Sequence, residues 1–496
     1  MEERSRIRVC VRLRPLIQED FKLAAAKLTV THPDICVQLL LDGQTIRMQR
    51  AFDAKTFRLD HTFDSASSQQ EVYNASFRPI VQEALGGFSG TGLAYGQTGS
   101  GKSHTMFGSP PSPADSGEAG LVQLAIEDVF AAAGERVKRG LVANVFVSFY
   151  QLYLEQAYDL LAMAQQTPIQ KHTASNGAGA MGAGAWAGVS RTGPGNGSTS
   201  GPGPLLGSAS ASGAGPVSGS VPGLVPLGIR DSARGSHVQH LQYLLVEDAT
   251  TACAMVRRGL ESRRVQATSF NVKSSRSHAI FQLYLDFEVE PGEVEPTCNG
   301  ANGGGGGSVG GSVGSKGGGP VSVSSLGDSC NIRRRVLTFV DLAGSERATH
   351  PRSKRQFQEA VGINKSISAL GNCIQALANN AQATAGVGAG VGEGAGSDVG
   401  LETGVGAGAS IGVGIHARHS LSRLPPAPTP THVPFRDCKL TRLLAEPLGG
   451  NAKVCVVVNV GPCAYNYEET RCTLKFARRA MRVCKSVGLS AVEQVR

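Results

Sequence analysis

The run AYGQTGSGKSHTM at residues 94–106 restricts the fold of this chain more than any other feature, because it contains the phosphate-binding pattern GxxxxGKS from Gly96 to Ser103. Its glycines let backbone N–H groups face a phosphate, Lys102 adds a mobile positive charge, and Ser103 offers a hydroxyl to Mg²⁺. The pattern needs a strand before it and a helix after it. The apolar run Gly90–Tyr95 predicts the strand, and we expect the helix to begin near Lys102. Because the chain contains 64 glycines in 496 residues, a chance match is the alternative that other motifs must exclude.

Glycine is concentrated in three stretches, at about 163–223, 292–328 and 379–432. Such Gly, Ala and Ser bias leaves too little apolar surface to offset chain entropy, so we predict three long disordered loop insertions. Roughly 350 residues remain without them, which is the size of one large α/β domain. Linkers between separate domains are the alternative, but related motifs straddle all three stretches and favour a single domain over residues 1–485.

Cysteine usage and hydropathy narrow the class of protein further. The 11 cysteines are odd in number and none are spaced CxxC, so neither a disulfide framework nor a zinc site is predicted. The N-terminus lacks an apolar segment, and no run approaches the roughly eighteen apolar residues of a membrane span. We therefore expect a reduced cytosolic protein that neither is secreted nor spans a membrane.

The formal net charge of +9 is unevenly distributed. Residues 433–485 hold ten Lys and Arg against four Asp and Glu, whereas the glycine-rich stretches are nearly uncharged. A local positive field of this kind can attract an anionic polymer, either a nucleic acid or an acidic protein surface, although such runs are often solvated helix faces. Charge alone does not choose between these alternatives.

Hydrophobic periodicity predicts alternating strands and helices along the chain. Strands are expected at 7–15, 141–153, 278–287, 333–342 and 453–460, and helices at 71–85, 245–263, 359–378, 439–444 and 467–483. This order favours an α/β fold with a central, mostly parallel β-sheet flanked by helices on both faces. The second insertion lies between two predicted strands, so we place it at the tip of a hairpin.

Hydrolysis of a nucleotide requires groups that detect the γ-phosphate and position water, and two further motifs supply them. Asp341 follows an apolar strand directly, where its carboxylate can hold the water shell of Mg²⁺, and Gly344 leaves a backbone N–H accessible to the γ-phosphate. In the second motif, Ser274 and Ser275 place two hydroxyls beside the guanidinium of Arg276.

Alone, the serine-rich segment would be interpreted as an ordinary polar loop. Together with the other motif it predicts a closing site: if both segments meet at the γ-phosphate, Arg276 and Glu346 can form a buried ion pair that excludes water and orients a nucleophile. Glu346 is more attractive in a proton relay through a second water or Ser275 than as a lone base.

These motifs together resemble the kinesin motor domain, over about residues 7–485 apart from the insertions. The resemblance rests on the phosphate loop and on six further segments, which are RLRP at 12–15, SSQQEVY at 67–73, SSRSH at 274–278, DLAGSER at 341–347, INKSISALG at 363–371 and VPFRDCKLTRLL at 433–444. Myosins also have a phosphate loop and two switch segments, but their switches do not have the sequences SSRSH and DLAGSE. The implied fold is a P-loop NTPase of the kinesin type, with ATP and Mg²⁺ as cofactors.

The resemblance also assigns roles to residues. The adenine site would be lined by Arg12, Arg14 and Pro15, and His104 would stack on the adenine ring. The phosphates would be gripped by Gly96, Gln97, Thr98, Gly99, Ser100, Gly101, Lys102 and Ser103. Mg²⁺ would be held by Ser103 and Ser275, and by Asp341 through water. The first switch would comprise Asn271, Ser274, Ser275 and Arg276, and the second Asp341, Gly344 and Glu346. The helix that begins near Glu359 is similar to the relay helix, which converts loss of the γ-phosphate into a tilt.

The basic region gains an interpretation from the same resemblance. In kinesins the relay helix and the elements after it lie on the acidic surface of the microtubule, so we expect contacts from Arg436, Lys439 and Arg442, with help from Arg352, Lys354 and Arg355. Nucleic-acid binding is disfavoured because no aromatic residues interleave with the basic ones in a stacking pattern. The third insertion, which contains no Lys, is not expected to act as an electrostatic tether.

Other details depart from the family or concern movement. Ser103 replaces the commoner Thr, Gln151 stands where Glu is usual, and Gly362 stands where Asn is usual. An N-terminal motor resembles plus-end-directed kinesins, and residues 486–496 are interpreted as the start of a neck linker, although they lack the usual Asn latch and include Gly488. The leading hypothesis is a microtubule-stimulated ATPase that moves along microtubules in the cytoplasmic cytoskeleton. A microtubule-binding or end-regulating ATPase without processive motility is the alternative.

Overall fold

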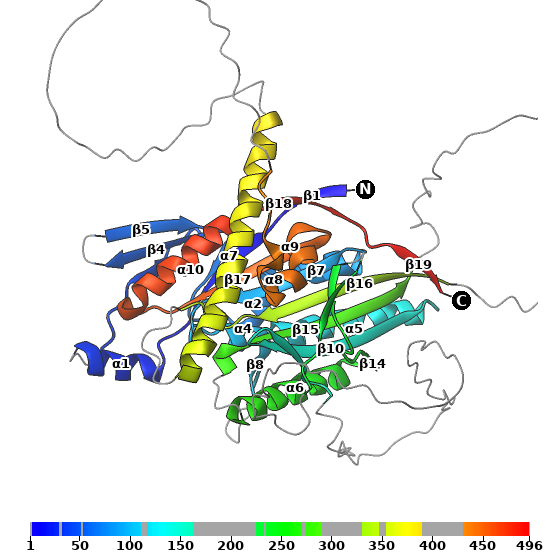
Figure 1. Cartoon of the computed structure of the whole chain (residues 1–496), viewed down its shortest axis with the longest axis horizontal. Helices are drawn as coiled ribbons and strands as arrows, with labels where there is room; N and C mark the ends of the chain where they lie inside the picture. Colours follow the sequence, from blue (N-terminus) through cyan, green and yellow to red (C-terminus); the bar gives the residue numbers. More distant parts are fainter. Residues whose placement is uncertain are drawn as a thin grey trace, which may run out of the picture.

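The computed structural model describes residues 2–28, 32–50, 53–110, 117–162, 225–232, 235–269, 274–289, 330–346, 354–388 and 430–495. Its centre is a ten-stranded sheet (Figure 1), whose main path runs β11-β10-β15-β16-β7-β17-β2-β6, with β14 beside β10 and β19 beside β16. The strands are β2 (Arg8–Leu13), β6 (His61–Phe63), β7 (Ser89–Tyr95), β10 (Ala143–Tyr153), β11 (Gln156–Asp159), β14 (Leu244–Val246), β15 (His278–Glu288), β16 (Cys330–Asp341), β17 (Ala452–Val460) and β19 (Val492–Val495).

The sheet is mixed, which corrects the expectation of a mostly parallel one. The pairings from β16 through β7, β17 and β2 to β6 are parallel, whereas β11, β10, β14, β15, β16 and β19 pair antiparallel. Parallel neighbours need a crossover connection, but β10 and β11 are joined by a hairpin. Its two turn residues, Leu154 and Glu155, both have positive φ, as the type I′ form of a two-residue hairpin loop requires.

Helices cover both faces of the sheet, as predicted. Along β17, Val454, Val456 and Val458 belong to one core and Cys455 and Val457 to the other, because successive strand residues point to opposite faces. The first core is covered by α7 (Lys354–Gly388), α8 (Lys439–Leu443), α9 (Ala445–Gly449) and α10 (Tyr467–Ala480). The second is covered by α3 (Phe77–Leu85), α4 (Lys102–Phe107), α5 (Leu121–Lys138) and α6 (Ala249–Ser269). Figure 1 shows α7 and α10 side by side on their face.

Some predicted helices differ in their bounds. The helix expected at 71–85 is divided at Ser76 into α2 (Gln69–Ala75) and α3, and a capping box between Ser68 and Glu71 begins α2. The helix expected from Leu245 begins at Ala249, because the preceding residues form β14. The remaining helices are α1 (Gln18–Leu28) and the short 3₁₀ helices η2 (Ser274–Arg276), η3 (Phe435–Asp437) and η4 (Ala464–Asn466).

Small sheets lie outside the central one. They comprise β1 (Glu2–Arg6) with β18 (Cys484–Gly488), β3 (Val37–Leu39) with β4 (Thr45–Arg50) and β5 (Asp53–Arg58), β8 (Gly108–Ser109) with β9 (Glu118–Ala119), and β12 (Ile229–Ser232) with β13 (Gly235–Val238). None of the described helices is long and apolar enough to cross a membrane.

The predicted insertions fall largely outside the described residues. The first, at 163–223, and the second, at 292–328, lie entirely outside them. The flanks of the second pair antiparallel as far as Glu288 opposite Ile332, which confirms the hairpin. Helix α7 extends into the third insertion over 379–388, so this part of the predicted loop is helical. The side chain of Asn380 exchanges two hydrogen bonds with the backbone of Thr431, at 2.8 and 2.7 Å, so the two ends of the predicted insertion are tied to each other.

Candidate functional site

The phosphate loop lies between β7 and α4, in the order that its sequence pattern requires. Gly96, Gly99 and Gly101 have φ of +148°, +77° and +99°. A Cβ on Gly96 would lie 2.3 Å from the backbone oxygen of Asn459, so glycine is required by close approach as well as by conformation. Gly101 is the N-cap of α4, whose first residues are Lys102 and Ser103.

The Lys102 ammonium lies inside this loop. Its Nζ donates to the carbonyl oxygens of Gly96 and Gln97, both at 2.8 Å, and the side chain is almost fully buried. Burial lowers the pKa of Lys102. A phosphate would replace these two carbonyls as the partner of a cation that already lies at the loop, so the residues present fit an anionic polyphosphate.

Ser103 and Asp341, two of the three residues predicted to hold Mg²⁺, lie next to each other. Ser103 Oγ donates to Asp341 Oδ2 at 2.7 Å, and Asp341 is 1% exposed. The other carboxylate oxygen, Oδ1, is buried and has no hydrogen-bond partner among the described residues. A hydroxyl and an unsatisfied carboxylate oxygen are the hard ligands that Mg²⁺ and its water shell prefer, so these two residues fit the ion.

Arg263 belongs to this cluster, although sequence reasoning missed it. Its guanidinium donates to Asp341 Oδ2 at 2.8 Å and to the Ser277 carbonyl oxygen at 2.8 Å, and its side chain is buried. Arg263 lies on α6, which carries other arginines, so no local signal distinguishes it. Only the fold brings it to the carboxyl end of β16.

The two predicted switch segments meet at the phosphate loop. The backbone N–H of Gly344 donates to the Ser275 carbonyl oxygen at 2.9 Å, and the N–H of Ser345 donates to the Gly96 oxygen at 3.1 Å. The Glu346 carboxylate accepts from the Thr98 N–H at 2.7 Å and also from the Thr98 hydroxyl. Phosphate loop, first switch and second switch are therefore joined through these contacts.

The expected ion pair between Arg276 and Glu346 is not formed. Glu346 is engaged by Thr98, and Arg276 pairs instead with Glu359, a buried carboxylate near the start of α7. The Tyr153 hydroxyl donates to the same carboxylate at 2.8 Å. Glu359 was predicted as part of the relay helix but not as a partner of the first switch, because its burial depends on strand β10.

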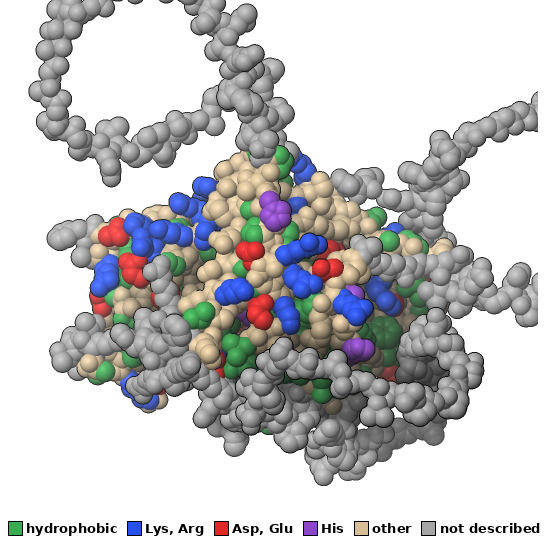
Figure 2. Space-filling model, viewed as in Figure 1, with side chains coloured by type: hydrophobic (Ala, Val, Ile, Leu, Met, Phe, Trp, Pro, Cys, Tyr) green, Lys and Arg blue, Asp and Glu red, His purple; other side chains and the backbone are tan. Residues whose placement is uncertain are grey.

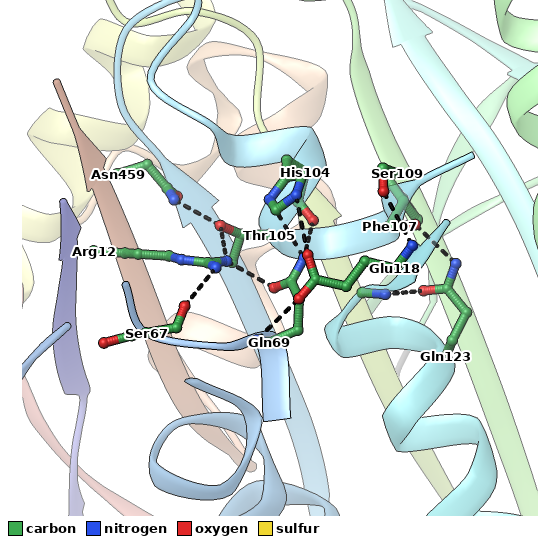
Figure 3. A network of polar contacts seen from close by, with 11 residues as sticks. Arg12, Ser67, Gln69, His104, Thr105, Phe107, Ser109, Glu118, Gln123 and Asn459 are labelled. Atoms are coloured by element: carbon green, nitrogen blue, oxygen red, sulfur yellow. Dashed lines mark hydrogen bonds and ion pairs between the residues drawn. The ribbon is translucent and has the colours of Figure 1, made fainter. Parts of the chain in front are cut away.

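The residues that the resemblance assigns to the adenine lie at different depths in the structure. Figure 3 shows Arg12 pointing toward α4, and its Nη1 donates to Thr105 Oγ1 of α4 at 3.0 Å and to Gln69 Oε1 of α2 at 2.7 Å. The side chain of Asn459 also donates to Thr105, at 2.8 Å. Burial lowers the pKa of Arg12, and its guanidinium braces α4 from within the fold. Arg12 is therefore bound to the helix that follows the phosphate loop.

Arg14, Pro15 and His104 lie nearer the surface. Arg14 Nε donates to the Gly99 carbonyl oxygen at 2.6 Å, and its two terminal nitrogens bind the Asp20 carboxylate at 2.6 and 2.7 Å. Pro15 and His104 are exposed. The His104 ring lies beside the Glu118 carboxylate (Figure 3), and the distance from His104 Nε2 to Glu118 Oε2 is 3.4 Å. Contact of these side chains with a base stays a prediction.

The basic residues expected at a polymer surface divide into two groups. Arg436 is exposed in η3, Lys439 is half-buried at the start of α8, and Arg442 pairs with Asp231 of β12 at 3.0 Å. The other group, Arg352 and the side chains of Lys354 and Arg355, lies outside the described residues, as do Asn271 and the Ser274 side chain. Figure 2 shows Lys and Arg interspersed with Asp and Glu on the face that carries α7 and α10.

A phosphate loop, a Ser–Asp pair suited to Mg²⁺ and two segments in contact with the loop define the class of P-loop nucleoside-triphosphate-binding proteins. Comparison with known proteins narrows the class. The kinesin motor domain family model matches residues 12–181 and 225–483. The chain belongs to the kinesin family.

Several relatives show the extent of the similarity. Kinesin-like protein 6 of Schizosaccharomyces pombe is 25% identical over 427 residues, which cover 86% of this chain and 38% of that protein. Mouse kinesin-like protein KIF18A is 27% identical over 85% of this chain and 31% of its own length. Kinesin-like protein KIF15 of Strongylocentrotus purpuratus is 29% identical over 96% of this chain and 23% of its own length. The chain thus spans well under half of these relatives.

Solved structures share the fold. A fast kinesin, studied for its ATPase mechanism and interactions with microtubules, superposes with a TM-score of 0.61 at 24% identity, covering 98% of this chain and 94% of that one. A KIF14 dimer in a two-heads-bound state, with AMP-PNP and a microtubule, also gives 0.61 at 23% identity, covering 98% and 97%.

Proposed function

We propose that this chain is the motor domain of an ATP-dependent microtubule motor, which hydrolyses ATP with Mg²⁺ and couples loss of the γ-phosphate to movement of α7 and to microtubule binding. The observation that carries the proposal is the junction at the phosphate loop, where Gly344 N–H binds the Ser275 oxygen and Ser345 N–H binds the Gly96 oxygen. A γ-phosphate entering this junction would compete for the Gly344 N–H and so draw on both switch segments.

The residues of the junction have distinct parts in the proposed reaction. Lys102 would exchange two carbonyl partners for phosphate oxygens, and Ser103 with Asp341 would hold Mg²⁺ directly and through water. When bound, Mg²⁺ supplies positive charge that offsets the charge on the phosphate oxygens. Release of Glu346 from Thr98 would free its carboxylate to pair with Arg276 and help orient water.

The proposed partner is the microtubule, which the KIF14 relative binds in its solved complex. In this chain, Arg436 is exposed on η3 and Lys439 is half-buried at the start of α8. Because exposed cations attract an acidic surface through screened Coulomb forces, we expect binding to weaken steeply with salt. Association with microtubules would place the protein in the cytoskeleton.

Plus-end-directed movement is a further part of the proposal. Residues 486–496, proposed as the start of a neck linker, continue from α10 along the core: β18 pairs antiparallel with β1, and β19 pairs with β16. The N–H of Gly488 donates to the Asn451 side chain, and the N–H of Ser490 donates to the Gly87 oxygen at 2.9 Å. These contacts support strand docking despite Gly488 and despite the absence of the usual latch residue.

Steady-state ATPase activity with and without microtubules tests the proposal. We expect stimulation by microtubules, together with salt-sensitive cosedimentation that is stronger for microtubules than for DNA. Turnover that microtubules leave unchanged would contradict the motor, and preferential binding to DNA would contradict the partner. A stimulated ATPase that fails to move microtubules in a gliding assay would favour the alternative, an end-regulating or microtubule-binding ATPase without processive motility.

The switch assignment has its own test, in Gly344→Ala and Glu346→Ala. A Cβ on Gly344 would lie 2.2 Å from Glu346 Oε2 and 2.3 Å from Thr98 Oγ1, so both variants disturb the Glu346 carboxylate. We expect each to lower turnover by at least about 100-fold, as loss of a proton-transfer group does, while binding of a fluorescent ATP analogue is retained. Glu468→Ala, which removes an exposed carboxylate from α10, is the control. Full hydrolysis by either switch variant would refute the assignment.

A further inference from the structure

Helix α7 is attached at two points to the first switch and to the start of β15, which follows it. Glu359 contacts Arg276, and Ser366 contacts His278. The two α7 residues are seven positions apart, which is about two turns of helix, so their side chains lie on the same face. Both residues are buried. Two contacts along one face fix the direction of a helix as well as its position.

The contact at Ser366 is a chain of hydrogen bonds that ends at the second switch. The backbone N–H of Ala343 lies 3.1 Å from His278 Nδ1, which therefore accepts. With Nδ1 an acceptor, the neutral ring carries its proton on Nε2, which donates to Ser366 Oγ at 2.9 Å. The Ser366 hydroxyl then donates to the Ile363 carbonyl oxygen at 2.8 Å. Each donor in this series of hydrogen bonds has one acceptor, so the direction of each hydrogen bond is determined.

The His278 ring stays neutral in this environment. The residue is 4% exposed, and burial lowers the pKa of His278 to about 3, with Arg263 acting in the same direction. Asp341 opposes the shift and Lys102 adds to it. The connection from Ala343 to α7 therefore stays uncharged at physiological pH, and it is shielded from solvent.

The contact at Glu359 has the opposite character. Glu359 is a buried carboxylate, but the Arg276 guanidinium that it binds is 27% exposed and can be solvated once it leaves. A second carboxylate, Glu346, lies in the neighbouring switch and is held by Thr98. Because Arg276 is accessible to solvent and has Glu346 as an alternative acceptor, it can exchange its ion-pair partner. The contact of His278 is buried and neutral, and among the described residues it has neither an accessible partner nor an alternative acceptor.

We propose that Ser366, bound to His278, is the pivot of α7, and that Arg276–Glu359 is the contact released when α7 changes its tilt. The proposal rests on the function proposed above. Because Ala343 immediately precedes Gly344, displacement of the Gly344 N–H moves the donor to His278 and reaches α7 through Ser366. Ser366 is a positioning residue, since its hydrogen bonds are made with His278 and Ile363 and not with the phosphate loop or with the Mg²⁺ donors.

The pair Ser366→Thr and Ser366→Val separates the hydroxyl from the volume of the side chain. Both variants add similar bulk at a buried site, but Thr keeps a hydroxyl that can bind the carbonyl of the preceding turn. We expect Val to lower the ratio of microtubule-stimulated to basal ATPase turnover by about threefold to tenfold, as loss of the buried hydrogen bond to His278 would, with the KM for ATP little changed. Thr should retain most of the ratio. Ser368→Ala, at an exposed site one half-turn further along α7, is the control.

A spectroscopic measurement tests the contact without reference to turnover. In ¹⁵N-histidine-labelled protein, His278 should show a protonated Nε2 and an unprotonated Nδ1 from pH 8 to pH 5, and Ser366→Val should shift the Nε2 resonance while Thr does not. The opposite tautomer, or titration in this range, refutes the pivot whatever the activity. Equal stimulation ratios in Thr and Val also refute it. A wild-type protein that shows the expected tautomer but no stimulation refutes the proposed motor function and leaves the contact itself established.

Discussion

The phosphate loop and helix α7 hold their places in the molecule by different means. The loop is shaped by its own backbone, through three glycines within six residues and the N-terminus of α4. Helix α7 is held by side chains from distant segments, namely Tyr153 of β10, Arg276 of the first switch and His278 beside that switch. A loop of the first kind tolerates changes of side chain but not an added Cβ, whereas the attachment of α7 depends on individual polar atoms.

Gly96→Ala should break the loop and give the largest effect. The new Cβ would meet the Asn459 backbone oxygen at 2.3 Å, and backbone cannot move aside as a flexible side chain can. We expect a loss of about 4 kcal/mol in the free energy of unfolding and loss of ATP binding, measured by denaturant unfolding and nucleotide fluorescence. Gly99→Ala is the matched control: φ is also positive, but no atom lies within 4 Å of the added Cβ, so only about 1 kcal/mol is expected. Equal losses would show that conformation, not close approach, governs the loop.

Asp20→Asn tests the side-chain support of the same loop and should have a smaller effect. Asp20 is buried and binds Arg14, which in turn donates to the Gly99 oxygen. Removing its charge leaves Arg14 without a carboxylate, so we expect a loss of about 3 kcal/mol in unfolding free energy, at the lower end for a broken buried pair. ATP affinity should fall far less than in Gly96→Ala, because the glycine backbone remains.

The contribution of the Arg14–Asp20 pair to the free energy of unfolding can be identified by its pH dependence. Burial alone would raise the pKa of Asp20, but hydrogen bonds from Arg14 and Tyr465 outweigh burial and lower the pKa to about 2. The folded-state pKa lies below the ordinary value of about 3.9, so the pair stabilises fully above about pH 4 and its contribution is lost as the pH falls toward 2. The stability difference between wild type and Asp20→Asn should therefore shrink over this range. A difference that stays constant down to pH 2 would show that Asp20 acts through packing rather than charge.

The same contrast explains how much could be predicted from the sequence. The glycine pattern, the place of Ser103 at the end of that pattern and the place of Asp341 at the end of an apolar strand follow from local sequence, and the structure brings Ser103 and Asp341 together. Three features could not be read in this way: Arg263 reaches Asp341 from α6, Glu359 takes Arg276 in place of Glu346, and the sheet is mixed. Each depends on contacts between segments far apart in the chain. A single sequence records which side chains can form ion pairs but not which of several partners lies nearest.

Glu359→Gln tests the attachment of α7 and should give the smallest change in stability. Gln keeps an oxygen for the Tyr153 hydroxyl but cannot hold the Arg276 guanidinium by charge, and Arg276 can be solvated. We expect a loss of about 1 kcal/mol in unfolding free energy, and a rise of about threefold in turnover without microtubules, since Arg276 becomes available to Glu346. Tyr153→Phe removes one hydrogen bond to Glu359 and keeps the ion pair, so a similar loss of stability should leave basal turnover unchanged. If both variants raise basal turnover alike, α7 is held by the buried carboxylate as a whole, and the ion pair is not the contact that restrains the switch.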